Sequence, residues 1–199
     1  MDRGQAITLE AIVAGLILLS SVVFALQMTA VTPLSASTSS QHIENQLSAS
    51  AEGLLAASVE DGSLERALLF YNETSSTFIG ATYQDYYAGS PPDNAFGDRL
   101  AWAFDRRGIA YNVYVTYDVG SVGRERRMIY RGQPSDNAVS AQTTVVLTDD
   151  APLYHDPDTD GVAEPQSGTD LETDYFMSDQ SPTTALYNVV NVEVVVWRI

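Results

Sequence analysis

Three aspartates at alternate positions are the residues of this sequence whose type and spacing most directly permit chemistry. Asp156, Asp158 and Asp160 are followed by Gly161, in the run Asp-Pro-Asp-Thr-Asp-Gly. Alternating carboxylates let three hard oxygen donors converge on one cation, and a glycine at the sixth place makes the sharp turn that such a loop needs. The spacing matches the first half of a calcium-binding loop.

The second half of the motif departs from that pattern. Ser167 stands at the twelfth place, where a calcium loop usually has a glutamate that binds through both oxygens. Glu164 or Asp170 would complete a site if the loop folded back. Two interpretations stay open: a calcium site that includes Asp156, Asp158, Asp160 and Glu164, or an acidic loop that is screened by ions in solution.

The sequence offers no catalytic constellation. His42 and His155 are its two histidines and lie far apart, and no Gly-x-Ser-x-Gly, His-Glu-x-x-His, P-loop or Gly-x-Gly-x-x-Gly pattern occurs. Cysteine is absent, which excludes disulfides and thiolate metal sites. We therefore expect a protein that is not an enzyme and has no resident cofactor other than calcium.

A carboxylate at the edge of a long apolar run is the second chemical feature. Residues 11–31 carry no charge, and Glu10 immediately precedes them. As a helix this stretch is about 32 Å long, enough to cross a hydrocarbon core of about 30 Å. We expect a polar N-terminus over residues 1–10 and one transmembrane helix over residues 11–31. A short N-terminus before a large domain favours a cytoplasmic N-terminus and an extracellular C-terminal head.

The run Arg-Gly-Gln-Ala-Ile-Thr-Leu-Glu, continued by the apolar stretch, resembles the class III signal segment of type IV pilin-like proteins, including archaeal pilins. The resemblance covers about the first 25 residues. It implies that a prepilin peptidase removes a short leader. A cut after Gly4 leaves Gln5 first and Glu10 sixth, whereas a cut after Gln5 leaves Ala6 first and Glu10 fifth. It also implies that Glu10 pairs with the new amino terminus of a neighbouring subunit.

The resemblance implies a structural role in the cell membrane. The chain would be a subunit or minor pseudopilin of a surface filament that forms homo- or hetero-oligomers through its N-terminal helix in the lipid bilayer. The alternative is a signal-anchored extracellular binding domain that does not assemble. A cleaved secretory signal is a third interpretation.

The charge balance is strongly acidic. The chain has 26 Asp and Glu against 10 basic residues, all of them arginine, for a net charge of −16. Such self-repulsion is largely removed in molar salt, where the Debye length is about 3 Å. The lysine-free acidic composition resembles that of proteins from halophilic archaea. It also argues against nucleic acid as a partner, because phosphate contacts need clustered basic residues.

Periodicity predicts an α+β head behind the anchor. Residues 32–62 are expected to form a stalk, or a continuation of the first helix, followed by a helix that ends at Asp61-Gly62. Within residues 63–199 we expect short helices packed on an antiparallel sheet of about four strands, with Ser63 as a helix N-cap and Trp102 in the core. The expected helices lie at 63–70 and 93–107, and the expected strands at 109–119, 124–131, 138–148 and 186–199. The last strand should be central, because it is apolar on both faces.

Three further features concern exposed parts of the head. Asn72-Glu73-Thr74 is an acceptor sequence for N-glycosylation, which is consistent with an exposed loop outside the cell. Residues 149–182 are rich in Asp, Pro, Gly, Ser and Thr and are expected to form an aperiodic acidic loop. Arg124, Arg126 and Arg127 are expected on a solvated strand face, paired with carboxylates.

The net charge of −16 predicts that the head needs high salt to stay folded. The melting temperature of the full chain in detergent should rise from low to molar NaCl, because the added ions screen the repulsion between carboxylates. Calcium added at fixed ionic strength tests the loop around Asp158 separately. A melting temperature that does not change with salt would contradict the first expectation, and one that does not respond to calcium would leave the ion-screened loop.

Overall fold

The computed structural model describes residues 2–81, 85–156, 160–171 and 175–199, and it describes their side chains except at residues 2–6, 27–40, 167, 169 and 170. The chain divides into two compact units, Met1–Ile43 and Glu44–Ile199. The second unit is the head.

The first unit consists of the N-terminal part of helix α1, which spans Asp2–Glu60. Among the described residues one helical stretch, Ile7–Leu26, is long and apolar enough to cross a membrane. None of its residues is buried inside the protein. Helix α1 includes Thr32 and Pro33, so residues 32–42 form the helical continuation rather than the alternative stalk.

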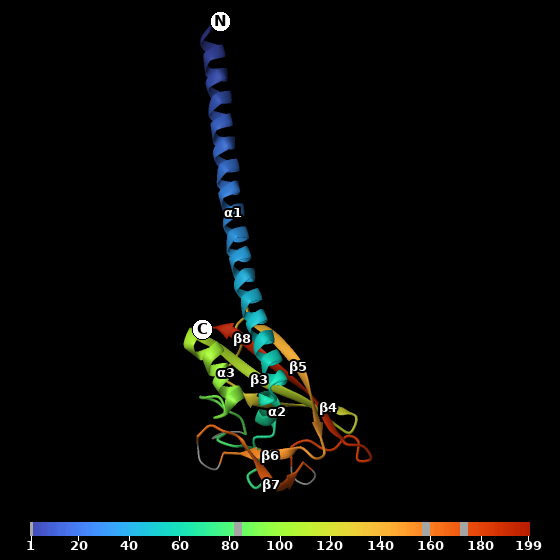
Figure 1. Ribbon diagram of the computed structural model, residues 1–199. Helices are drawn as coiled ribbons and strands as arrows, with labels where there is room; N and C mark the ends of the chain where they lie inside the picture. The colour runs from blue at the N-terminus through green and yellow to red at the C-terminus, as the bar shows by residue number, and fades with distance from the viewer. Residues whose placement is uncertain (1, 82–84, 157–159, 172–174) are drawn as a thin grey trace. The chain divides into compact units, whose positions relative to one another are not determined.

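The head contains the predicted antiparallel sheet of four strands. They are β3 (Ile109–Val119), β4 (Val122–Ile129), β5 (Val139–Thr148) and β8 (Leu186–Arg198), in the order β4-β3-β8-β5 (Figure 1). β3 and β4 pair as an antiparallel hairpin. The last strand, β8, is central, since it pairs with β3 on one side and β5 on the other. The predicted α+β architecture is confirmed.

One face of the sheet forms the core with the helices. Every second residue of β8 is fully buried, namely Val190, Val192, Val194 and Val196. The end of α1 that belongs to the head crosses the sheet with α3 (Ala95–Ala103) beside it (Figure 1). α2 (Ser63–Leu68) and the 3-10 helix η1 (Asp105–Arg107) complete the helical set of the described residues. α1 contributes Leu47, Ala51, Leu54 and Leu55 to the core.

The other face of the sheet is open. Val146 and Val189 are 55% and 46% exposed there. The apolar composition of both faces of β8 therefore reflects its central place in the sheet and not burial between two layers.

The expectation of an aperiodic loop over residues 149–182 is wrong. The segment contains β6 (Pro152–His155) and β7 (Glu164–Asp170), which pair as an antiparallel hairpin away from the C-terminus (Figure 1). Leu153, Leu171, Tyr175 and Met177 are buried in the core. The Tyr175 hydroxyl donates a hydrogen bond of 2.6 Å to the Leu68 carbonyl oxygen. Isolated apolar residues at irregular spacing anchor this segment, and they leave no periodic pattern in the sequence.

A shorter pair of strands, β1 (Tyr71–Asn72) and β2 (Thr77–Phe78), was also not predicted. Each strand has two residues, which is too short to show an alternation. A hydrogen bond from the Ser75 backbone to Asn72 Oδ1 stabilises the turn between them.

The N-cap of α2 differs from the prediction. Gly62, not Ser63, is the N-cap residue, with a φ of 71° in the left-handed region that favours glycine. The Ser63 N–H donates to Asp61 Oδ1 at 3.0 Å, so the aspartate satisfies the first amide of the helix. Asn94 caps α3 by accepting a hydrogen bond of 3.0 Å from the Gly97 N–H.

Two arginines of β4, Arg126 and Arg127, lie over aromatic rings, and among the described residues neither forms the predicted ion pair with a carboxylate. The Arg126 guanidinium carbon lies 4.6 Å from the Phe176 ring centroid and also faces Tyr71 and Phe78. The Arg127 guanidinium lies 4.2 Å from the centroid of Tyr130. Cation–π contacts of this kind are attractive where the cation loses water.

Two helical glycines provide a matched test of this packing. A Cβ at position 97 would meet the Pro92 carbonyl oxygen at 1.8 Å, whereas one at position 53 would meet nothing within 4 Å. Gly97→Ala should lower the free energy of unfolding by about 3 kcal/mol, because backbone must move to admit the methyl group. Gly53→Ala should raise it by up to about 1 kcal/mol through helix propensity. Denaturant unfolding in molar salt measures both, and equal effects would contradict the packing described here.

Candidate functional site

The residues of the predicted signal segment all lie in α1. Gly4, Gln5 and Ala6 belong to its first turns, and the structure describes their backbone but not their side chains. Glu10 lies inside the apolar stretch Ile7–Leu26 and has an exposed side chain. It is the one ionisable residue of that stretch. The Glu10 carboxylate therefore lies on an exposed apolar helix. An ionisable group on such a helix is costly inside a membrane unless it has a partner.

The structure brings Asp156 and Asp160 together in one turn. Asp156 accepts backbone hydrogen bonds of 3.2 Å from Asp160 N–H and 3.0 Å from Gly161 N–H. Asp160 accepts one of 2.9 Å from Val162 N–H. These carboxylates are turned toward backbone amides, an arrangement that closes the turn without a cation.

The other predicted ligands do not join this turn. Asp158 lies outside the described residues, and Glu164 is an exposed residue of β7 paired in register with His155. The described part of the chain contains no group of three or more residues placed to hold a metal ion. Calcium binding stays a prediction. Asp93, which sequence reasoning missed, lies close enough that a Cβ on Gly161 would be 3.2 Å from its Oδ1.

Asn72 is accessible, as an N-glycosylation acceptor must be. It is an exposed residue of β1, and its Oδ1 accepts the hydrogen bond from Ser75. The side-chain nitrogen to which a glycan would be attached makes none of the hydrogen bonds seen among the described residues.

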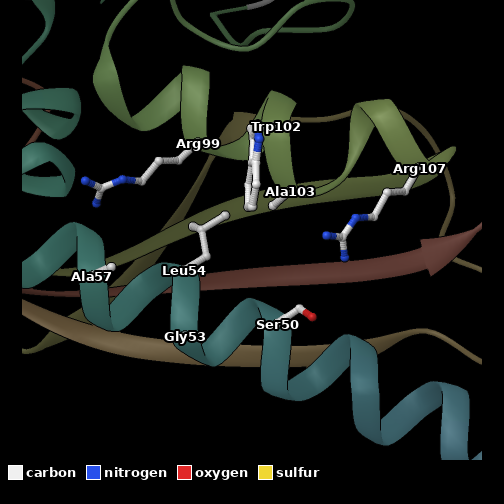
Figure 2. Close-up of a pocket in the computed structure, with 8 residues that line it drawn as sticks. All are labelled: Ser50, Gly53, Leu54, Ala57, Arg99, Trp102, Ala103 and Arg107. Atoms are coloured by element: carbon white, nitrogen blue, oxygen red, sulfur yellow. The ribbon is translucent and has the colours of Figure 1, made fainter.

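A groove between α1 and α3 is a concave surface of the head with a largely apolar lining. Its volume is about 370 Å³. Figure 2 shows the Trp102 side chain pointing toward α1, with Arg99 to one side and Arg107 to the other. The residues that line the groove, here called the head groove, are Ser50, Gly53, Leu54, Ala57, Arg99, Trp102, Ala103 and Arg107.

Trp102 is exposed, and the prediction that it belongs to the core is wrong. Its exposed fraction is 61%, whereas Phe96, Leu100 and Phe104 are fully buried. These three residues recur at every fourth position and form the buried stripe of α3, so a residue two positions from Leu100 must point away from it. Helical spacing would have predicted this exposure. The Arg107 guanidinium carbon lies 5.9 Å from the centroid of the Trp102 ring.

Arg99 connects the head groove to the corner between α1 and α2. It forms an ion pair with Asp61 and donates hydrogen bonds to the hydroxyls of Ser58 and Ser63, at 3.3 and 3.4 Å. Hydrogen bonds from Ser63, together with the Arg99 charge, lower the pKa of Asp61 from 3.8 to about 2. Arg107 forms no ion pair in the part of the chain that the structure describes.

The head groove has the chemistry of a binding surface. Its lining has no histidine or carboxylate to act as a base, and its one hydroxyl, on Ser50, donates to the Gln46 carbonyl oxygen at 2.8 Å. The groove presents the exposed indole of Trp102, the guanidinium of Arg107 stacked on it, and the backbone at Gly53. These groups favour a ligand surface on which an anionic group lies next to an apolar group.

Comparison with known proteins gives one match. The model of a family described as "Family of unknown function (DUF7288)" matches residues 3–196. The chain belongs to this family. No curated protein and no solved structure matches it. The DUF7288 match begins before the apolar stretch and ends within β8, so it includes both the N-terminal helix and the head.

The low pKa of Asp61 predicts a specific acid sensitivity in this DUF7288 chain. Because the folded-state pKa of about 2 lies below the ordinary 3.8, the carboxylate stabilises the head above pH 4, and this contribution is lost as the pH falls toward 2. Asp61→Asn should be less stable than the wild type at neutral pH, with a difference that shrinks between pH 4 and 2. Asp98→Asn, at an exposed position of α3, is the control. Melting curves at fixed salt measure both. A difference for Asp61→Asn that is constant with pH would contradict this.

Proposed function

We propose that this chain is a membrane-anchored, pilin-like cell-surface protein that serves as a structural subunit or minor pseudopilin of a surface filament. One observation carries the proposal: the exposed apolar helix Ile7–Leu26 holds a single ionisable residue, Glu10, three positions from its start. A carboxylate there is costly unless it is paired. The new amino terminus of a neighbouring, processed copy is a partner of the right charge.

Three further features support the proposal. The polar residues before the helix resemble a class III leader, with cleavage after Gly4 or Gln5 by a prepilin peptidase. The head has its own buried core, so it can fold outside the membrane on the far side of the anchor. The accessible acceptor Asn72 and the absence of cysteine and lysine fit an extracellular head of a halophilic archaeon. In this arrangement the N-terminus is cytoplasmic.

In this role Glu10 determines which partner and which register the helix adopts. Pairing with a neighbouring amino terminus compensates the cost of the buried carboxylate without adding much net stability. The apolar side chains around it pack equally well in several registers, because none of them is directional. A buried ion pair accepts one register only.

Glu10→Gln tests the proposal in the native host. The variant should stay in the membrane with a folded head, because glutamine is less costly in lipid than an unpaired carboxylate, while the yield of multimers falls at least tenfold. Ser20→Ala, a change of one exposed polar group in the same helix, is the matched control and should assemble normally. Multimers are measured by size in mild detergent and by electron microscopy of the cell surface.

Gly4→Val separates the two cleavage positions. It should block removal of the leader if the cut follows Gly4, and have less effect if it follows Gln5. An unprocessed wild-type chain, together with normal behaviour of Glu10→Gln, would contradict the proposal and leave an anchored binding domain that does not assemble.

A further inference from the structure

We infer that the head groove is the docking site for helix α1 of a second copy of this chain, through a stripe of four exposed residues on that helix. The stripe, here called the α1 stripe, consists of Glu52, Ala56, Val59 and Glu60. The inference rests on the proposed assembly function and names the surfaces by which two heads meet.

The head groove requires a partner for physical reasons. A tryptophan buries 150–250 Å² when it is covered, and such side chains dominate the energetics of interfaces. Trp102 is 61% exposed at the centre of a concave surface whose opposite wall has no side chain at Gly53. The buried stripe of α3 does not use the indole, so folding alone does not explain an aromatic residue at this position.

The positive charge of the head groove indicates that the surface docked in it is acidic. The charged residues of the groove lining are both arginines, in a chain with a net charge of −16. Asp61 already compensates Arg99, whereas Arg107 is held by its stacking on Trp102 and keeps its donors for an incoming carboxylate. A second copy of so acidic a chain is complementary to this corner.

The α1 stripe has the spacing that the groove needs. Glu52, Ala56 and Glu60 are four residues apart and lie on one helical face. The two carboxylates are about 12 Å apart along the axis, at 1.5 Å per residue. Arg99 on α3 and Arg107 on η1 lie to either side of Trp102 (Figure 2). Between the glutamates, Ala56 and Val59 (42% exposed) offer an apolar surface to Trp102.

The groove and the stripe are different surfaces of one head. Around the axis of α1, Glu52 and Val59 lie roughly 100° or more from the groove wall at Gly53 and Ala57, whereas Ala56 and Glu60 lie closer to that wall. When two copies meet through two different surfaces, one copy keeps its groove free and the other keeps its stripe free. Further copies can therefore add at both ends, and the contact does not close into a dimer. This is the symmetry that a filament requires.

The absence of cysteine makes the contact directly testable. In the full-length chain, Ala56→Cys on the stripe is combined with Ala103→Cys in the groove, and native membranes are oxidised with copper phenanthroline in molar salt. The double variant should give a ladder of disulfide-linked multimers, because each chain carries both halves of the contact. Either single variant should give no ladder. Ala103→Cys combined with Ser140→Cys, at an exposed position of β5, is the control pair and should give none.

Trp102→Ala in the double-cysteine background measures the contribution of the indole and should reduce the ladder about tenfold. Arg107→Glu should reduce it as well, and adding Glu52→Arg or Glu60→Arg should restore it if the charges meet. Arg124→Glu makes the same charge change on β4 and should leave the ladder intact.

The outcomes separate this inference from the proposed function. Multimers in mild detergent without a disulfide-linked ladder would overturn the docking site, while the assembly function would stand. Binding of an acidic partner other than a second copy at the head groove would overturn the docking site in the same way. A chain that is monomeric in detergent and gives no ladder would overturn both. A ladder that ends at the dimer would show a closed, two-fold contact and would overturn the open arrangement.

Discussion

An exposed apolar helix that holds one carboxylate is the constraint on which the rest of the account depends. Water does not stabilise the stretch Ile7–Leu26, in which large side chains such as Leu16 and Ile17 are more than 60% exposed. At about 25 cal/mol per Å² of apolar surface, covering this helix contributes more than any single interaction in the head. In the proposed assembly, lipid covers the apolar residues and the amino terminus of a second processed copy supplies the charge that pairs with Glu10.

The head meets a different requirement, which is to stay folded with a large excess of negative charge. Its interior is built from neutral contacts, such as the buried valines of β8 and the hydroxyl of Tyr175 on the Leu68 carbonyl. Arg126 is placed among aromatic rings, which salt screens less than an exposed ion pair. In a head built in this way many carboxylates stay on the surface, and Glu52 and Glu60 of the α1 stripe are two of them.

The sequence predicted the elements whose patterns repeat and missed those that depend on single residues. The alternation in residues 109–119 and the apolar run in 186–199 predicted the two central strands. The β6–β7 hairpin was missed because Leu153 and Tyr175 are isolated apolar residues in a polar segment. The head groove was missed because tryptophan is usually buried, although the spacing from Leu100 points Trp102 outward. Glu10 was found because a charge in an apolar run is conspicuous.

The intact mass of the protein from native membranes tests the central claim most directly. The account predicts a chain that lacks its leader, with a new amino terminus at Gln5 or Ala6. A mass that includes Met1 would contradict processing and leave a plain anchored domain. Loss of the whole apolar stretch would contradict the anchor itself and identify a secreted head.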